Sequence, residues 1–210
     1  VGKTTVATNL AVMRQASSMT VVLVDADEQR SASEFAEQRE ALNRGRIPCV
    51  KASGKDTLSI VRDLAGQYDS VIVDVGGRDT TAQRAAMLAA DIVLLPFPPG
   101  NYDAWTLPQV ENLVSEVRKA NPDRDAVAFL SRAYLSGPDN NEAAEMLKGS
   151  SVLRFVDAPL TDRKVFARSA GEGLAVFEIK DRRAGKARSE VMRLYDAVFN
   201  GGAELNTNAA

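Results

Sequence analysis

The chain has 210 residues, of which 45% are hydrophobic and 26% charged, so it is long enough to bury one sizeable core. Lys and Arg total 26 against 28 Asp and Glu, and the net charge of -2 argues against a protein whose whole surface coats nucleic acid. The single Cys excludes an intrachain disulfide, and the absence of His argues against a zinc site or a histidine-based catalytic relay.

Short β-branched runs alternate with longer helical patterns along the chain. The predicted strands are apolar on both faces, as buried parallel strands are, and lie at 20–25, 47–52, 70–75, 91–97, 126–131 and 152–156. The predicted helices lie at 4–17, 31–44, 56–66, 80–89, 103–120, 139–148, 161–171 and about 185–199. This alternation predicts an α/β fold with a doubly wound, mainly parallel sheet flanked by helices. We expect a single domain over residues 1–200 and a flexible, Gly-rich tail over 201–210.

The opening sequence VGKTT contains part of a phosphate-loop pattern. Gly2, Lys3 and Thr4 match the last three positions of G-x-x-x-x-G-K-[ST]. In that pattern the amides at the helix start face phosphate oxygens, the Lys neutralises the β and γ phosphates, and the hydroxyl ligates Mg²⁺. The same residues also suit an ordinary solvated helix start, so this stretch alone leaves both interpretations open.

Carboxylates end two later strands, at the edge of the sheet where ligands bind. Asp25 and Asp27 lie on one side of an extended segment; they are either solvated acids or groups that hold Mg²⁺ indirectly and orient a water for attack on the γ phosphate. Asp74 precedes Gly76 and Gly77 in SVIVDVGGRD, which has the form of a Walker B segment, or of an Asp that caps a strand before a Gly turn. The phosphate-loop pattern and these two strand ends follow one another in the order that a phosphate site requires, and together they favour nucleotide binding.

Together these motifs resemble the ParA/MinD group of deviant Walker ATPases, and most closely the short ParA proteins of the ParF type that partition plasmids. The matching segments are GKTT at 2–5, VDADEQ at 24–29, RDLAGQYDSVIVDVGGRD at 62–79, AADIVLLPFPPGNYDAW at 89–105 and DRKVFARSAGEGLAVFE at 162–178. The resemblance implies a P-loop ATPase that binds ATP and Mg²⁺, forms a nucleotide-dependent homodimer and then binds nonspecific DNA. It also implies slow hydrolysis until a ParB- or ParG-like centromere-binding partner stimulates it, in the bacterial cytoplasm and, with ATP bound, at the nucleoid.

The resemblance also implies roles for individual residues. Lys3 and Asp27 would be catalytic, as the phosphate lysine and the carboxylate that orients the water. The metal-site residues would be Thr4, Asp74 and, acting indirectly, Asp25. The nucleotide-contacting residues would be Gly2, Lys3, Thr4, Thr5, Gly76, Gly77, Ser131, Arg132 and Pro159.

Three departures from the family pattern stand out. Glu28 occupies the position where the family has Pro, and Ser131 stands where relatives often carry Asn or Thr before the Arg, so Arg132 is equally compatible with a surface arginine. The first strand and the front of the phosphate loop, with the signature lysine that crosses the dimer, do not appear in the sequence. We therefore expect a sheet without that central strand, and we assign ATPase activity to the complete protein.

The segment KDRRAGKARSEVMR at 180–193 is locally basic. The candidate contacts to DNA phosphates are Lys180, Arg182, Arg183, Lys186 and Arg188, and a solvated helix face is the alternative. We expect no membrane role, because the tail GGAELNTNAA lacks the bulky apolar residues and the basic face of an anchoring helix.

Two other functions remain open. Relatives use the same ATP cycle to position carboxysomes, chemoreceptor clusters or conjugation complexes, and the partner dictates the cargo. An ATP-dependent synthetase of the dethiobiotin type would share the scaffold, but it needs fixed cationic groups in a substrate pocket. The region after Asp74 instead has a Gly switch and the run PFPPGNYDAW, in which Phe97, Tyr102 and Trp105 suit core, dimer or partner contacts alike.

Overall fold

The computed structural model describes residues 2–77, 80–100 and 103–200, with the backbone alone at 103–105. The predicted flexible tail at 201–210 and Tyr102 lie outside the described residues, as does the side chain of Trp105. In this part of the chain, no helix combines the length and the apolar character needed to cross a membrane.

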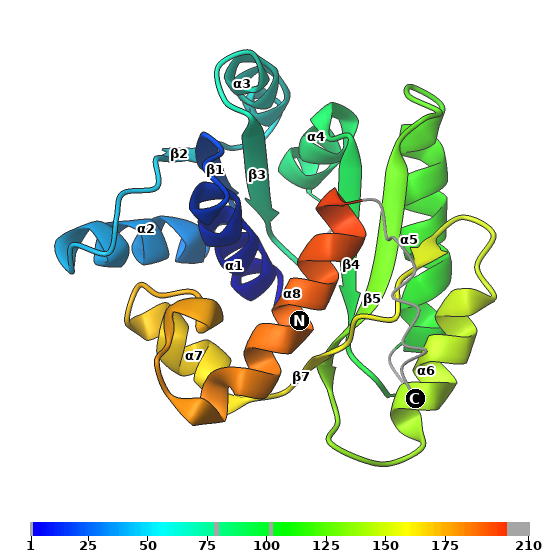
Figure 1. The fold of residues 1–210 in the computed structure, drawn as a ribbon. Coiled ribbons are helices and arrows are strands. Elements are labelled where there is room, and N and C mark those ends of the chain that lie inside the picture. The colour runs from blue at the N-terminus through cyan, green and yellow to red at the C-terminus, as the bar shows by residue number, and fades with distance from the viewer. Residues whose placement is uncertain (1, 78–79, 101–102, 201–210) are drawn as a thin grey trace.

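Helices and strands alternate along the chain, as predicted (Figure 1). The α-helices are α1 (Lys3–Ala16), α2 (Ser31–Ala41), α3 (Asp56–Ala65), α4 (Thr81–Ala89), α5 (Asp103–Arg118), α6 (Asp139–Lys148), α7 (Lys164–Gly171) and α8 (Gly185–Phe199). The strands are β1 (Val21–Ala26), β2 (Cys49–Lys51), β3 (Ser70–Val75), β4 (Ile92–Phe97), β5 (Asp125–Ala133), β6 (Arg154–Phe155) and β7 (Leu160–Thr161). Two 3₁₀ turns, η1 (Val176–Glu178) and η2 (Arg182–Ala184), join α7 to α8.

The element boundaries differ from the predicted ones mainly late in the chain. The helix predicted to begin at residue 161 begins at Lys164, because Leu160 and Thr161 form β7 and pair with β5. The strand predicted at 152–156 shortens to Arg154–Phe155. Elsewhere a local cap fixes the boundary, as at α4, where the Thr80 side chain accepts a hydrogen bond from the Gln83 amide at 3.1 Å.

The strands form two parallel groups. One has the order β2-β1-β3, and the other has the order β4-β5-β6 with β7 also paired to β5. Helices cover both faces: Phe129 of β5 packs into a cluster with α1, α7 and α8, whereas Ala128 and Leu130 of the same strand pack into a cluster with α4, α5 and α6. Alternate residues of one buried strand therefore support two helical layers. The parallel sheets flanked by helices confirm the predicted α/β class.

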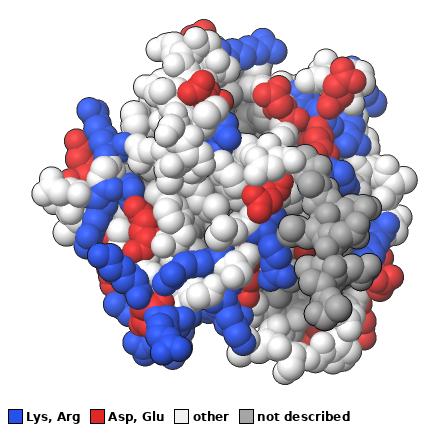
Figure 2. Space-filling view, viewed as in Figure 1, with Lys and Arg blue, Asp and Glu red and all other residues white. Residues whose placement is uncertain are grey.

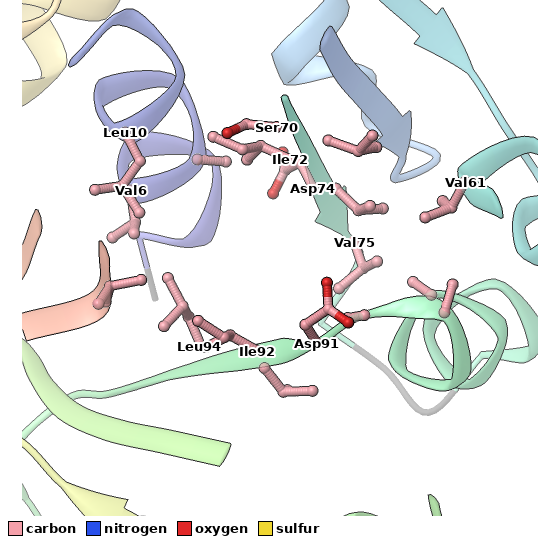
Figure 3. Close-up of a pocket in the computed structure, with 18 of the residues that line it drawn as sticks. Val6, Leu10, Val61, Ser70, Ile72, Asp74, Val75, Asp91, Ile92 and Leu94 are labelled. Carbon is pink, nitrogen blue, oxygen red and sulfur yellow. The ribbon is translucent and has the colours of Figure 1, made fainter. Parts of the chain in front are cut away.

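A slot separates the two groups of strands. Within the described residues, β3 and β4 are not hydrogen-bonded to each other, and a cavity of about 430 Å³ lies between α1, β3, β4 and α8. Figure 3 shows Val6 and Leu10 of α1, Ile72 of β3 and Leu94 of β4 pointing into this space. The slot leaves one edge of β3 and one edge of β4 without a hydrogen-bonded neighbour among the described residues.

Candidate nucleotide site

The predicted phosphate and carboxylate residues meet where β1 and β3 end and α1 begins. The two strands pair in parallel with Asp25 opposite Asp74, so both carboxylates reach the same edge of the sheet. The Thr4 hydroxyl in the first turn of α1 donates a hydrogen bond to Asp74 Oδ2 at 2.6 Å. Residues 70 positions apart in sequence are thus joined directly, as an ATP and Mg²⁺ site requires.

The start of α1 has the features of an anion-binding helix terminus. Gly2 adopts φ 89°, in the left-handed region, and a Cβ there would lie 2.9 Å from the Ser131 hydroxyl oxygen at the end of β5. This position therefore favours Gly on both conformational and steric grounds. The first turn carries no acidic residue, and Gly2 has no side chain that could cap it. The positive end of the helix dipole is left to an external anion.

The two predicted switch glycines lie beside the two predicted catalytic residues. A Cβ at Gly77 would be 3.4 Å from Lys3 Nζ, and a Cβ at Gly76 would be 3.5 Å from Asp27 Oδ1. The Asp27 carboxylate is half-buried and accepts a hydrogen bond from the Gln29 amide at 3.0 Å. The segment after β3 therefore lies close to both the lysine and the carboxylate that would flank the γ phosphate.

Asp74 is a buried carboxyl group with a raised pKa. It is 1% exposed, and burial raises its pKa to about 6, with the nearby Asp25 and Asp27 acting in the same direction while Thr4 and Lys3 oppose it. Its Oδ1 atom is buried and makes no hydrogen bond within the described structure. An unpartnered buried carboxylate oxygen beside a threonine hydroxyl is a suitable place for a hard cation or its bound water.

Both carboxylate oxygens of Asp25 are engaged by the backbone of the protein. It is 2% exposed; its Oδ1 accepts the Asp27 amide at 3.2 Å and its Oδ2 accepts the Ser33 amide, in the first turn of α2, at 2.7 Å. Because both oxygens already accept backbone N–H groups, the geometry favours the indirect role over direct ligation. Asp25 fixes the start of α2 and the loop that carries Asp27.

The donor set fits Mg²⁺ bound together with a nucleotide. Among the described residues, no group of three His, Cys, Asp or Glu side chains is arranged to hold a metal ion unaided. Magnesium commonly takes one or two protein oxygens and completes its shell with water and substrate phosphates. Thr4 and the free oxygen of Asp74 supply such a pair.

The other predicted nucleotide contacts differ in their burial and in their position relative to the start of α1. Ser131 is buried next to Gly2, whereas Arg132 is exposed, with φ 56°, at an irregularity in the β5–β7 pairing. Pro159 is half-buried directly before β7, and the Thr5 carbonyl accepts the Asn9 side-chain amide at 2.8 Å. Asn9 was missed by sequence reasoning, although a polar residue in the apolar run VATNLAV was a signal for it.

The predicted DNA contacts divide into two kinds. Arg182 and Lys186 line a surface recess with Arg193, whereas Arg183 pairs with Asp181 at 2.8 Å. Arg188 is half-buried and donates to the backbone carbonyl of Asp181 at 2.9 Å, which holds the turn before α8, and its role as a phosphate contact stays a prediction. Lys180 is exposed. In Figure 2, Lys and Arg gather at the lower left, over the region of α7, η2 and the start of α8.

Comparison with known proteins identifies the family. The family model described as the "CobQ/CobB/MinD/ParA nucleotide binding domain" matches residues 1–174. The chain belongs to this family. The match covers the nucleotide-site residues from Gly2 to Pro159 and the segments that carry the ParA/MinD resemblance, apart from residues 175–178 of the segment at 162–178. The basic segment at 180–193 lies outside the match.

One named relative resembles the chain along most of its length. The "Maintenance of carboxysome distribution protein A" of Gloeobacter kilaueensis is 30% identical over 200 residues, which cover 92% of this chain and 87% of that protein. The narrower resemblance to ParF-type plasmid partition proteins is thus supported only at the level of the family.

Two solved structures share the fold. A plasmid partition protein of Borrelia burgdorferi bound to AMPPNP superposes with a TM-score of 0.66 and 17% identity, covering 94% of each chain. Cobyrinic acid a,c-diamide synthase of Mycobacterium smegmatis, with a bound ATP analogue and magnesium, gives a TM-score of 0.71 and 17% identity, covering 95% of this chain and 91% of that one. At these identities the likeness concerns the fold.

Proposed function

We propose that the protein is a Mg²⁺-dependent ATPase whose ATP-bound homodimer binds nonspecific DNA and moves a cargo along it, with plasmid or chromosomal DNA as the first candidate cargo. The observation that carries the proposal is the junction of α1, β1 and β3, where the Thr4–Asp74 hydrogen bond joins the helix start to a buried carboxylate. Such a protein would work in the bacterial cytoplasm, at the nucleoid when ATP is bound.

Each residue of the junction has a chemical task in this proposal. Lys3 and the amides at the start of α1 would neutralise the β and γ phosphates, and Thr4 and Asp74 would hold Mg²⁺, which would supply positive charge to the phosphate groups. Asp27 orients the attacking water, and Gly76 and Gly77 follow the γ phosphate as it leaves. In this arrangement phosphate binding depends on Lys3, whereas the chemical step depends on Asp27.

That separation gives a direct test in the full-length protein. Asp27→Ala should retain ATP binding and nucleotide-dependent dimerisation but lose hydrolysis, because the water has lost its anchor. Turnover is measured as phosphate release, and dimerisation by light scattering with ATP. Normal turnover of Asp27→Ala would remove Asp27 from the mechanism.

The DNA step has its own test. Charge reversal at Arg182 and Lys186 should weaken binding of nonspecific duplex DNA and flatten the dependence of affinity on salt, because fewer counterions are released. Nucleotide affinity should stay unchanged, since both residues line the surface recess formed by η2 and α8 and neither belongs to the junction of α1, β1 and β3. DNA affinity that equals that of the unmodified protein at two salt concentrations would exclude this surface.

A carboxysome is the second candidate cargo, and one observation favours it: the 30% identical relative is a carboxysome distribution protein, and the alignment covers 87% of its length. The partner decides between cargoes. Stimulation of ATP hydrolysis by a centromere-binding protein would support DNA partition, whereas stimulation by a carboxysome-associated adaptor would support the second candidate.

The alternative function is that of an ATP-dependent synthetase. The fold is compatible with it, because cobyrinic acid a,c-diamide synthase has the same fold. The same assay separates it from the proposed function. Hydrolysis that responds to DNA or a protein partner supports cargo positioning, and hydrolysis that responds only to a small carboxylic acid supports a synthetase.

A further inference from the structure

The last part of the motif at 162–178 has no role in the site described so far. Gly173–Glu178, called the clamp segment below, runs from the end of α7 through η1. It contacts the two helices that carry the two halves of the nucleotide site. Helix α1 begins with Lys3 and Thr4, and α2 follows the loop that holds Asp27.

The contact with α1 passes through Asn9. This side chain is 3% exposed; its Oδ1 accepts the Val176 amide at 2.8 Å and its Nδ2 donates to the Thr5 carbonyl at 2.8 Å. Val176 is fully buried, so its N–H group would have no partner without Asn9. One amide group therefore connects the clamp segment to the first turn of α1, next to Thr4.

The contact with α2 passes through Arg39. Its guanidinium is 3% exposed and forms a bidentate ion pair with Glu178, with N–O distances of 2.8 and 2.9 Å, and it also donates to the Gly173 carbonyl at 2.9 Å. Gly173 has φ 63°, and a Cβ there would lie 2.7 Å from the backbone N and Cα of Arg39. The clamp segment and α2 thus touch backbone to backbone, at a distance that only Gly permits.

Helix α2 is consequently held at both ends. Its first turn is fixed by the Ser33 amide on Asp25 Oδ2, at 2.7 Å, and its last turn is fixed by Arg39. A helix of 11 residues is a rigid rod of about 16 Å. Loss of the contact at its last turn would therefore leave α2 free to pivot about its first turn, which adjoins the Asp27 loop.

We propose that the clamp segment fixes α2 relative to α1 and so holds Asp27 in position against Lys3 and Thr4. Asn9, Arg39 and Glu178 are positioning residues of the nucleotide site, since they act through the two helices and do not touch the nucleotide. This proposal rests on the proposed function for the role of Asp27, but the mechanical claim about α1 and α2 does not.

The chain contains a matched control for this claim. Arg163 and Glu190 form a second buried, charge-paired contact, with 2.7 Å between Nη2 and Oε1 and a further bond from Arg163 Nε. It joins the β7–α7 connection to α8, and Thr161 also donates to Glu190. Removing the charge of Glu190 should cost stability much as removing that of Glu178 does, without releasing α2.

The experiment compares Glu178→Gln with Glu190→Gln in the full-length protein. Spin labels at two exposed positions, Ser17 at the end of α1 and Glu34 in α2, report the distance between the helices in a Cys49→Ser background. We expect a broadened or shifted distance distribution for Glu178→Gln and an unchanged one for Glu190→Gln. In steady-state ATP hydrolysis, Glu178→Gln should lower kcat about tenfold with KM changed less than threefold, because misplacement affects the water-orienting side and spares the phosphate contacts.

Each outcome decides the matter. An unchanged distance distribution in Glu178→Gln, or an equal loss of kcat in both variants, overturns the proposal, and so does a released α2 with unaltered kcat. If the unmodified protein does not hydrolyse ATP, the proposed function fails, while the distance measurement still supports or overturns the clamp. If Glu178→Gln does not fold, Arg39→Lys is the second variant, because it keeps the positive charge but cannot form the bidentate pair with Glu178. We expect Arg39→Lys to change the distance distribution and kcat in the same way.

Discussion

The Asp74 carboxyl group should make stability depend on pH in a definite direction. Burial raises its pKa from 3.8 to about 6 in the folded protein, so the folded state binds this proton more tightly than the unfolded state does. The stabilisation of the folded state by the protonated Asp74 carboxyl group is fully present below pH 3.8 and is lost as pH rises through 6. A shift of about two units corresponds to roughly 3 kcal/mol.

Asp74→Asn removes this titration while keeping an acceptor for the Thr4 hydroxyl. In buffer with EDTA, the free energy of unfolding of Asp74→Asn minus that of the unmodified protein should increase between about pH 5 and about pH 7.5, the range that brackets the raised pKa. Urea denaturation at these two values measures it. A difference that is the same at both would show that Asp74 is not held in an unfavourable charged state.

Gly2 should tolerate substitution less well than another left-handed glycine. Gly2→Ala combines backbone strain with a Cβ 2.9 Å from the Ser131 hydroxyl oxygen, whereas a Cβ at Gly54, which has φ 53°, would meet no atom of a more distant residue within 4 Å. We expect losses of about 2 to 3 kcal/mol for Gly2→Ala and about 1 kcal/mol for Gly54→Ala in thermal or urea unfolding. Equal losses would show that Ser131 does not pack against the start of α1.

At the scale of the elements, backbone protection should differ between strands. β5 is paired on both sides, to β4 and to β6 and β7, whereas β3 and β4 each have one edge along the slot. Because unpaired amides exchange readily, hydrogen exchange in the 210-residue chain should be slowest in Asp125–Ala133 and measurably faster in β3 and β4. Protection of β4 equal to that of β5 would mean that the slot is closed in solution.

The extent to which sequence predicts these elements follows from their length. The apolar runs that lead to Asp25 and Asp74 carry a clear strand signal, so the predicted bounds of β1 and β3 agree with the structure to within a residue. β7 has only two residues and exists because β5 offers it a partner, which no local pattern encodes. Arg39 and Glu178 are 139 residues apart and each looks like an ordinary surface charge, so their buried pair could not be predicted.

At the scale of the whole molecule, the parallel pairing of β1 and β3 beside α1 brings motifs that are far apart in the sequence to one edge of the sheet. The sequence predicted Lys3, Thr4, Asp25, Asp27 and Asp74 together because parallel strands present their carboxyl ends at one edge of a sheet. The same reasoning could not foresee that Arg188 donates to the Asp181 carbonyl or that Asp25 engages both oxygens with backbone amides. Those outcomes depend on tertiary packing.

The central claim is that Gly2, Lys3 and Thr4 form the rear of a phosphate-binding loop, and equilibrium binding of Mg·ATP to the full-length Lys3→Ala protein tests it most directly. A control, Lys119→Ala, removes an exposed lysine directly after α5. We expect a roughly tenfold or greater loss of affinity for Lys3→Ala and an unchanged affinity for Lys119→Ala. Equal affinities of the two variants would contradict the assignment of the opening stretch to a phosphate loop.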